Sequence, residues 1–241
     1  MIELIQLTKK FGSLVAVNEL TLAIPRGEFF AMLGPNAAGK TTTLKMITGL
    51  MKPSAGAARV CGFDAQGEPI EVRRRLAYVP DFPFLYDKLT ALEFFRFTGQ
   101  LFGMTDAQIE MNVKELIPRF HLAGFANLPL ESLSHGTRQR VAIVSALLHH
   151  PEVFVVDEPM VGLDPQHARV VKDVLKERSR AGMTVLMSTH ELSVAEEMAD
   201  RIGIMHGGKL IAVGTRDELR KLSGTSGPLE EVFLALTAEA K

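Results

Sequence analysis

A glycine-bearing loop between two apolar segments carries residue types that hold phosphate groups. It reads Gly-Pro-Asn-Ala-Ala-Gly-Lys-Thr from Gly34 to Thr41 and follows the apolar segment 28–33. After Gly39 the apolar residues take helical spacing, so the loop leads into a helix N-terminus, where backbone N–H groups and the helix dipole attract anions. Lys40 can reach the β and γ phosphates of a nucleotide, and Thr41 offers a hydroxyl to Mg²⁺. The pattern predicts a phosphate-binding loop, against the alternative of a chance glycine-rich turn.

Two adjacent acids follow a continuous apolar segment further along the chain. Asp157 and Glu158 come directly after 153–156. A buried parallel strand ends at the sheet edge where open α/β sheets bind their ligands. We expect Asp157 to hold a metal ion through water, and Glu158 to orient the attacking water and accept its proton. The alternative is structural, because acidic residues commonly end strands.

A short polar segment, Leu-Ser-His-Gly-Thr over 133–137, comes just before a helical apolar face at 141–148. Ser134 is suited to cap that helix. In the functional interpretation, Ser134, the Gly136 backbone and the helix N-terminus form a second phosphate-binding surface. One phosphate loop already encloses the phosphates on its own side, so this second surface would serve the nucleotide of another molecule.

His190 follows the apolar segment 184–188. If that segment is a parallel strand, His190 emerges at the same sheet edge as Asp157 and can reach the terminal phosphate. The same residue, or Ser188 or Thr189 beside it, could instead cap the next helix. Spacing alone leaves both interpretations open. His121, His149 and His150 have no such setting and are expected to be surface or core residues.

The segments that position these residues alternate between strand and helix patterns. Alternating or continuous apolar residues predict strands, and the His-Gly-Gly-Lys turn at 206–209 predicts a hairpin. The expected strands are 2–7, 14–24, 28–33, 153–156, 184–188, 202–205 and 210–213. Capping boxes at Thr90, Thr105 and Thr215, and an N-cap at Asp164, predict helix starts. The expected helices run from Gly39 to near Pro53, from Thr90, from Thr105, over 137–149, from Asp164, from Thr215 and over 229–236.

This order of elements predicts three parts. Residues 1–83 and 151–222 form an α/β core that carries the phosphate loop and an antiparallel β subdomain at the amino terminus. Residues 84–150 form an inserted helical subdomain with the 133–137 segment, and 223–241 form a carboxyl-terminal linker and short helix. With 241 residues, 46% of them apolar, the chain can bury the core that this organisation needs.

Composition excludes several functional classes. The chain has 27 Lys and Arg against 28 Asp and Glu, a formal net charge of -1, and we expect no nucleic-acid partner. Its single cysteine, Cys61, cannot form an internal disulfide. No basic-then-apolar leader opens the sequence, and no apolar stretch approaches the roughly 20 residues that cross a bilayer. We expect a cytoplasmic protein whose connection to any membrane runs through other chains.

With these motifs in this order, the chain resembles the ATP-binding subunits of ABC transporters along nearly its whole length. The resemblance assigns the switch histidine to His190, the adenine-stacking aromatic to Phe11, Walker B to 153–158, the D-loop to 162–164 and the signature motif to 133–137. The Walker A residues are Gly34, Pro35, Asn36, Ala37, Ala38, Gly39, Lys40, Thr41 and Thr42. The resemblance implies a P-loop NTPase core, ATP and Mg²⁺ as ligands, and catalytic roles for Lys40, Glu158 and His190.

Three positions depart from the usual family pattern. The signature is commonly Leu-Ser-Gly-Gly-Gln, so His135 and Thr137 differ while Ser134 and Gly136 remain. Ala37 replaces a common glycine, and we expect it to keep a negative φ because a positive φ costs an alanine about 1 kcal/mol. Asp81 stands at the Q-loop glutamine; this shorter, charged side chain could still bind Mg²⁺ or water.

Asp81, the residues after it and the carboxyl-terminal segment 229–233 are similar to the exporter-type branch of the family. The resemblance implies an ATP-dependent homodimer beneath integral-membrane subunits, peripheral on the cytoplasmic face of the membrane. The apolar cluster Phe82, Phe84, Leu85 and Tyr86 would then line a groove for a membrane-subunit helix, or else pack between subdomains. Two further classes stay open: a soluble ABC-type ATPase that drives a non-transport assembly process, and a non-hydrolysing nucleotide-binding regulator.

Overall fold

A six-stranded sheet forms the centre of the computed structural model, which describes residues 1–239. In spatial order its strands are β10 (Lys209–Gly214), β9 (Arg201–His206), β3 (Phe29–Leu33), β8 (Thr184–Thr189), β7 (Val153–Asp157) and β6 (Leu76–Val79). All neighbours are parallel except the β9–β10 hairpin. Strands β3, β7 and β8 are buried along their whole length, as expected for parallel strands covered on both faces.

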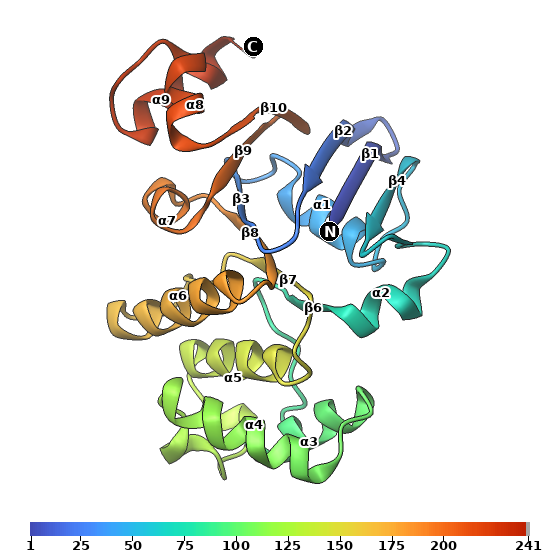
Figure 1. The fold of residues 1–241 in the computed structure, drawn as a ribbon, viewed down its shortest axis with the longest axis vertical. Coiled ribbons are helices and arrows are strands. Elements are labelled where there is room, and N and C mark those ends of the chain that lie inside the picture. The colour runs from blue at the N-terminus through green and yellow to red at the C-terminus, as the bar shows by residue number, and fades with distance from the viewer. Residues whose placement is uncertain (240–241) are drawn as a thin grey trace.

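A second, antiparallel sheet has the order β2-β1-β4-β5 and lies beside α1 (Figure 1). Its strands are β1 (Ile2–Phe11), β2 (Leu14–Ile24), β4 (Ala55–Val60) and β5 (Phe63–Asp64). Inward-facing residues such as Leu4 and Val60 join Leu44 and Ile47 of α1 (Lys40–Ile47) in one apolar cluster with the inner side chains of the central sheet. This cluster anchors the helix that follows the phosphate loop.

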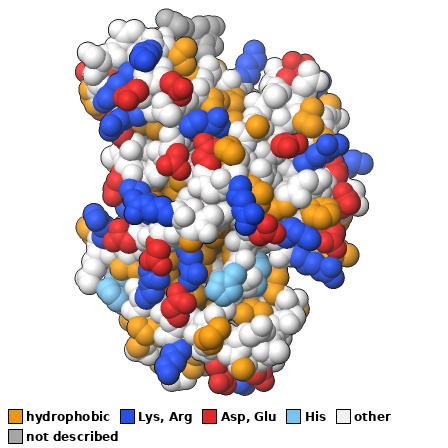
Figure 2. Space-filling view, in the orientation of Figure 1, with side chains coloured by type: hydrophobic (Ala, Val, Ile, Leu, Met, Phe, Trp, Pro, Cys, Tyr) orange, Lys and Arg blue, Asp and Glu red, His pale blue; other side chains and the backbone are white. Residues whose placement is uncertain are grey.

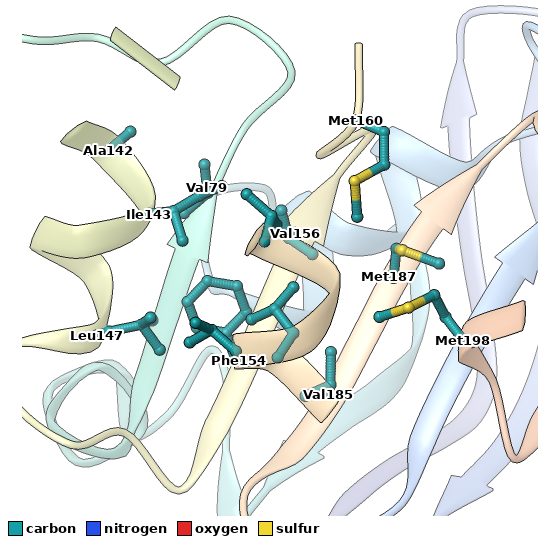
Figure 3. Close-up of a cluster of buried hydrophobic side chains, with 14 of the residues drawn as sticks. Val79, Ala142, Ile143, Leu147, Phe154, Val156, Met160, Val185, Met187 and Met198 are labelled. Carbon is teal, nitrogen blue, oxygen red and sulfur yellow. The ribbon is translucent and has the colours of Figure 1, made fainter. Parts of the chain in front are cut away.

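Three helices gather at one end of the molecule (Figure 1). They are α3 (Ala91–Leu101), α4 (Asp106–Arg119) and α5 (His135–Leu147), with 3₁₀ turns at Ala123–Phe125 and Leu130–Ser132. Helix α5 joins them to the sheet: Ala142, Ile143 and Leu147 face Val79 and Phe154 in the shared core (Figure 3). The capping boxes predicted at Thr90 and Thr105 are confirmed.

The remaining helices flank the sheet or close its far end. They are α2 (Pro69–Arg75), α6 (Pro165–Arg180), α7 (Leu192–Met198), α8 (Arg216–Ser223) and α9 (Leu229–Glu239). Asp164 caps α6 by accepting a hydrogen bond from His167 N at 3.0 Å, and Thr215 forms the predicted capping box of α8 with Glu218. Helices α8 and α9 pack together at the end opposite α3 and α4 (Figure 1).

Four predicted helix boundaries were wrong. Helix α5 ends at Leu147 rather than at 149, and α9 ends at Glu239 rather than at 236. The helix after Gly39 ends at Ile47 rather than near Pro53, because Gly49 adopts a left-handed conformation (φ 68°) and turns the chain, which leaves Leu50 60% exposed. Helix α5 begins at His135 rather than Thr137, because Ser134 is its N-cap. Strands β4, β5 and β6 and helices α2 and α7 had no prediction.

Lys and Arg side chains are interspersed with Asp and Glu over the face in view (Figure 2), as the near-zero net charge suggests. Across residues 1–239, none of the helices is both long enough and apolar enough to cross a bilayer.

A buried histidine just after α5 gives the fold a testable pH dependence. His149 stacks on Phe102 with ring centroids 3.7 Å apart, and burial lowers its pKa to about 4. In the unfolded chain the pKa of His149 is near 6.5, so the unfolded state takes up the proton first as the pH falls. The folded state therefore loses stability below pH 6.5. Between pH 7 and pH 5 we expect this loss to reach about 2 kcal/mol of unfolding free energy.

We expect the variant His149→Phe to escape that loss while keeping the stacked ring. Urea unfolding of both proteins at pH 7 and pH 5 measures the difference. Parallel pH profiles for the two proteins would contradict the assignment.

Candidate active site

The phosphate loop lies between β3 and α1 and depends on glycine at both ends. A Cβ built on Gly34 would come 2.4 Å from the Met205 carbonyl oxygen, and one built on Gly39 would come 2.5 Å from that of Ala16. Lys40 closes the loop from inside: its Nζ donates to the Gly34 carbonyl at 2.7 Å and to the Pro35 carbonyl at 3.2 Å. The predicted strand, loop and helix are therefore present in that order.

The expectation that Ala37 keeps a negative φ was wrong: its φ is 63°. Ala38 N donates to the Pro35 carbonyl at 3.2 Å, so residues 35–38 form a β-turn with Ala37 in its third position. A positive φ at that position is typical of a type II turn. The loop therefore holds an alanine in a conformation that costs about 1 kcal/mol, in order to keep the turn that leads into α1.

Asp157 ties the loop helix to two strands. It is 1% exposed at the end of β7. Its Oδ2 accepts from Thr41 Oγ1 at 2.6 Å, and its Oδ1 accepts from the Ser188 hydroxyl. Ser188 was not predicted as a site residue, although a serine at the end of the apolar segment 184–187 was the available signal.

Glu158, Lys40 and His190 converge on one point. Glu158 Oε1 lies 2.9 Å from His190 Nδ1 and 3.6 Å from Lys40 Nζ. Glu158 has a positive φ of 49°, a strained backbone of the kind that collects at functional sites. His190 does not cap the next helix, because the N-cap of α7 is Glu191, which makes no side-chain cap hydrogen bond. The geometry thus favours the first of the two interpretations that spacing left open, in which His190 lies at the phosphate end of the sheet beside Glu158.

Burial and like charges act on the site's ionisable groups. Burial lowers the pKa of Lys40, and the Glu158 and Asp157 carboxylates act in the opposite direction. Burial also raises the pKa of Asp81, as do the charges of Asp157 and Glu158. The site therefore concentrates negative charge around one lysine, which suits it to a cation as well as to phosphate groups.

One cavity of about 330 Å³ collects most of the predicted residues. Those lining it are Phe11, Pro35, Asn36, Ala37, Ala38, Gly39, Lys40, Thr41, Thr42, Asp81, Asp157 and Glu158. Gly34 and His190 do not line the cavity but contact residues that do. The Gly34 carbonyl accepts a hydrogen bond from Lys40, and His190 pairs with Glu158. Phe11 is 45% exposed, with Lys9 Nζ 5.1 Å from its ring centroid, so a ring face lies at the rim of the cavity.

Ser134 and Gly136 do not line this cavity. Ser134 is exposed at the start of α5, where its Oγ accepts from Thr137 N at 3.3 Å. The predicted cap is therefore present, and this helix N-terminus lies outside the lining of the nucleotide cavity of its own chain.

The donor atoms at the floor of the cavity fit Mg²⁺. The Thr41 hydroxyl and the Asp157 carboxylate are hard oxygen ligands, lie 2.6 Å apart, and stand beside the loop that would hold phosphate oxygens.

Comparison with known proteins agrees with this geometry. The family model described as "ABC transporter" matches residues 17–161. The chain is 36% identical over 219 residues to the Nod factor export ATP-binding protein I of Cupriavidus pinatubonensis, covering 91% of this chain and 67% of that protein.

Solved structures give the same result. The ATP-binding subunit of an ABC transporter superposes with a TM-score of 0.93 at 34% identity, covering 98% of this chain and 99% of that one. A dimeric ATP-binding cassette in a post-hydrolysis state bound to ADP and Pi superposes with a TM-score of 0.82 at 29% identity, covering 89% and 98%.

The fold, the cavity and the family match lead to one identity. The family model spans more than half of the chain and includes the phosphate loop, the signature segment and both acids. The chain belongs to the ABC transporter family and is one of its ATP-binding, ATP-hydrolysing subunits.

Proposed function

We propose that two copies of this chain sandwich ATP between them and use its hydrolysis to drive exporter-type membrane subunits from the cytoplasmic face of the membrane. The observation that carries the proposal is the separation of the two phosphate-binding surfaces. Lys40 and Glu158 line the nucleotide cavity, whereas Ser134 and Gly136 lie outside it on the inserted helical part. We divide the chain accordingly into a core (1–83 and 151–222), a helical signature subdomain (84–150) and a carboxyl-terminal segment (223–241).

In this proposal the phosphate loop and its lysine hold the nucleotide. Lys40 gives up its carbonyl partners at Gly34 and Pro35 for the β and γ phosphates, while the N–H groups of the loop surround the phosphate oxygens. Phe11 stacks on the adenine from the rim of the cavity.

The acids and the histidine carry the hydrolytic step. Thr41 and Asp157, with Asp81 nearby, are the residues that would hold Mg²⁺, which neutralises charge on the phosphate oxygens when it is bound. Glu158 orients a water molecule toward the γ phosphate and accepts its proton. His190, held 2.9 Å from Glu158, reaches the departing phosphate from the neighbouring strand β8.

The second copy completes the site. A helix N-terminus with an exposed serine attracts phosphate, but Ser134 does not line the cavity of its own chain. A second copy that brings Ser134 and Gly136 over the γ phosphate closes the site to bulk solvent, and the same contact is repeated at the other nucleotide.

An apolar groove between the Q-loop and α3 suits a helix from a membrane subunit. It encloses about 190 Å³ and is lined by residues such as Phe84, Leu85, Phe94 and Phe102. Phe84 is 95% exposed and Tyr86 59% exposed, while Leu85 is half-buried, so the cluster is not simply core packing. Exposed aromatic side chains beside an apolar groove are typical of an interaction surface.

The variant Lys40→Ala should lose hydrolysis and bind ATP much more weakly, because it removes the buried cation that faces the phosphates and leaves the loop backbone in place. Phosphate release and nucleotide titration on the purified protein measure both effects. Lys45→Ala, in the last turn of the same helix, is the matched control and should behave like the parent. Near-normal turnover in Lys40→Ala would refute the role of the loop.

The variant Glu158→Gln should bind ATP, hydrolyse hardly any of it, and accumulate as a dimer. The amide keeps the size and hydrogen-bonding ability of the side chain but cannot accept the proton, so the closed state forms and does not resolve. Size-exclusion chromatography should show a monomer without nucleotide or with ADP, and a dimer with ATP.

Glu152→Gln is the control for that experiment, since Glu152 stands just before the same strand at its opposite end. If Glu158→Gln stays monomeric at millimolar ATP, the sandwich is wrong. If it hydrolyses ATP at the parent's rate, the role of Glu158 is wrong.

The variant Leu85→Asp should uncouple transport from hydrolysis, because a charge in the groove opposes docking of an apolar helix while the nucleotide cavity is untouched. ATPase activity of the isolated chain and transport by the assembled complex are measured side by side. Leu222→Asp, an equally drastic change at the exposed surface of α8, should affect neither. Normal transport by Leu85→Asp would remove the groove from the proposal.

A further inference from the structure

His135 lies in the signature segment, where the usual family pattern has glycine, and its exposed ring contacts two other loops. The imidazole packs against Phe82 of the Q-loop, with ring centroids 6.0 Å apart and planes inclined at 53°. A glycine in its place makes no such contact. The side chain therefore adds a connection that the glycine of the usual pattern cannot make.

The D-loop holds the other side of the same ring. A Cβ built on Gly162 would come 2.4 Å from His135 Cδ2, so a side chain at position 162 would displace the imidazole from its present position. The neighbouring Gly136 is equally close: its Cβ would come 2.7 Å from the Gly162 carbonyl oxygen. The signature segment thus rests directly on the D-loop of its own chain, with His135 between that loop and Phe82.

These contacts form a continuous connection between the two surfaces of the chain that bind phosphate. Asp81 lines the nucleotide cavity, Phe82 follows it in sequence, and Phe82 touches His135. His135 in turn stands between Ser134 and Gly136, the two residues offered to the second copy. Asp81, Phe82 and His135 therefore form a path of neighbouring residues from the nucleotide cavity to the signature segment.

We infer that His135 is a positioning residue: through Phe82 and Gly162 it sets the place of Ser134 and Gly136 according to the occupancy of the nucleotide cavity in its own chain. The inference rests on the ATP sandwich proposed above and concerns its regulation. His135 does not line the cavity, so it acts on dimer closure and not on nucleotide binding by the single chain.

The test uses the Glu158→Gln chain, in which dimer formation is read without turnover. ATP is titrated and the fraction of dimer is measured by light scattering, while binding of a fluorescent ATP analogue to the dilute monomer is measured separately. Adding His135→Gly should raise the ATP concentration for half-dimerisation by about threefold to tenfold, which is the range for loss of one aromatic contact, with analogue binding unchanged.

Four further variants separate positioning from a direct interface contact. Phe82→Ala should give the same shift as His135→Gly, and the double variant should shift no further than either single change. His135→Phe keeps a ring against Phe82 and should dimerise like the parent. Phe125→Ala removes another partly exposed aromatic side chain of the helical subdomain, outside the groove and the nucleotide cavity, and serves as the control.

The outcomes are distinct. A Glu158→Gln parent that never dimerises overturns the proposed function and this inference with it. A parent that dimerises, combined with an unchanged titration in His135→Gly, overturns the inference alone. Additive effects of His135→Gly and Phe82→Ala overturn it as well, because they show two independent contacts.

Discussion

The buried carboxylate of Asp157 is the constraint on which the site depends. A charge that is 1% exposed is costly unless its oxygens are hydrogen-bonded, and here one oxygen is satisfied by Thr41 of α1 and the other by Ser188 of β8. Three elements that are far apart in sequence must therefore meet around one group. The order β3-β8-β7 brings them together, because the phosphate loop, His190 and the two acids each follow one of three adjacent parallel strands.

Local chemistry was predictable from the sequence, and long-range pairing was not. The capping boxes at Thr90 and Thr105 depend on residues three apart, and the phosphate-loop motif is contained in eight consecutive residues. Each motif could therefore be recognised from a short segment of sequence alone. Strand β4 pairs with β1 some fifty residues earlier, and α2 gives way to β6 between Arg75 and Leu76 without a turn residue. No local sequence pattern within 55–79 predicts β4 or the boundary between α2 and β6.

Two errors at the site share a physical cause. Ala37 was expected to avoid positive φ because an isolated alanine does, yet the turn that begins at Pro35 requires it. Ser188 was missed because its role exists only when β8 lies beside β7 and Asp157 needs a donor. In both cases tertiary structure overrode the preference of a single residue, and such overrides are expected where a protein stores strain for function.

Two of the departures from the usual family pattern meet in space. The Asp81 side chain is shorter than the glutamine of the family and extends less far into the nucleotide cavity. The His135 side chain is larger than the glycine and makes a contact with Phe82 that glycine cannot make. The imidazole lies close enough to lower the pKa of the Asp81 carboxyl, against the larger raising effect of burial. A carboxylate close to both Asp157 and Glu158 is disfavoured by like charge, and the nearby His135 imidazole acts in the opposite direction. The substitution at 135 therefore makes physical sense together with the one at 81, as parts of one altered junction between the nucleotide cavity and the signature segment.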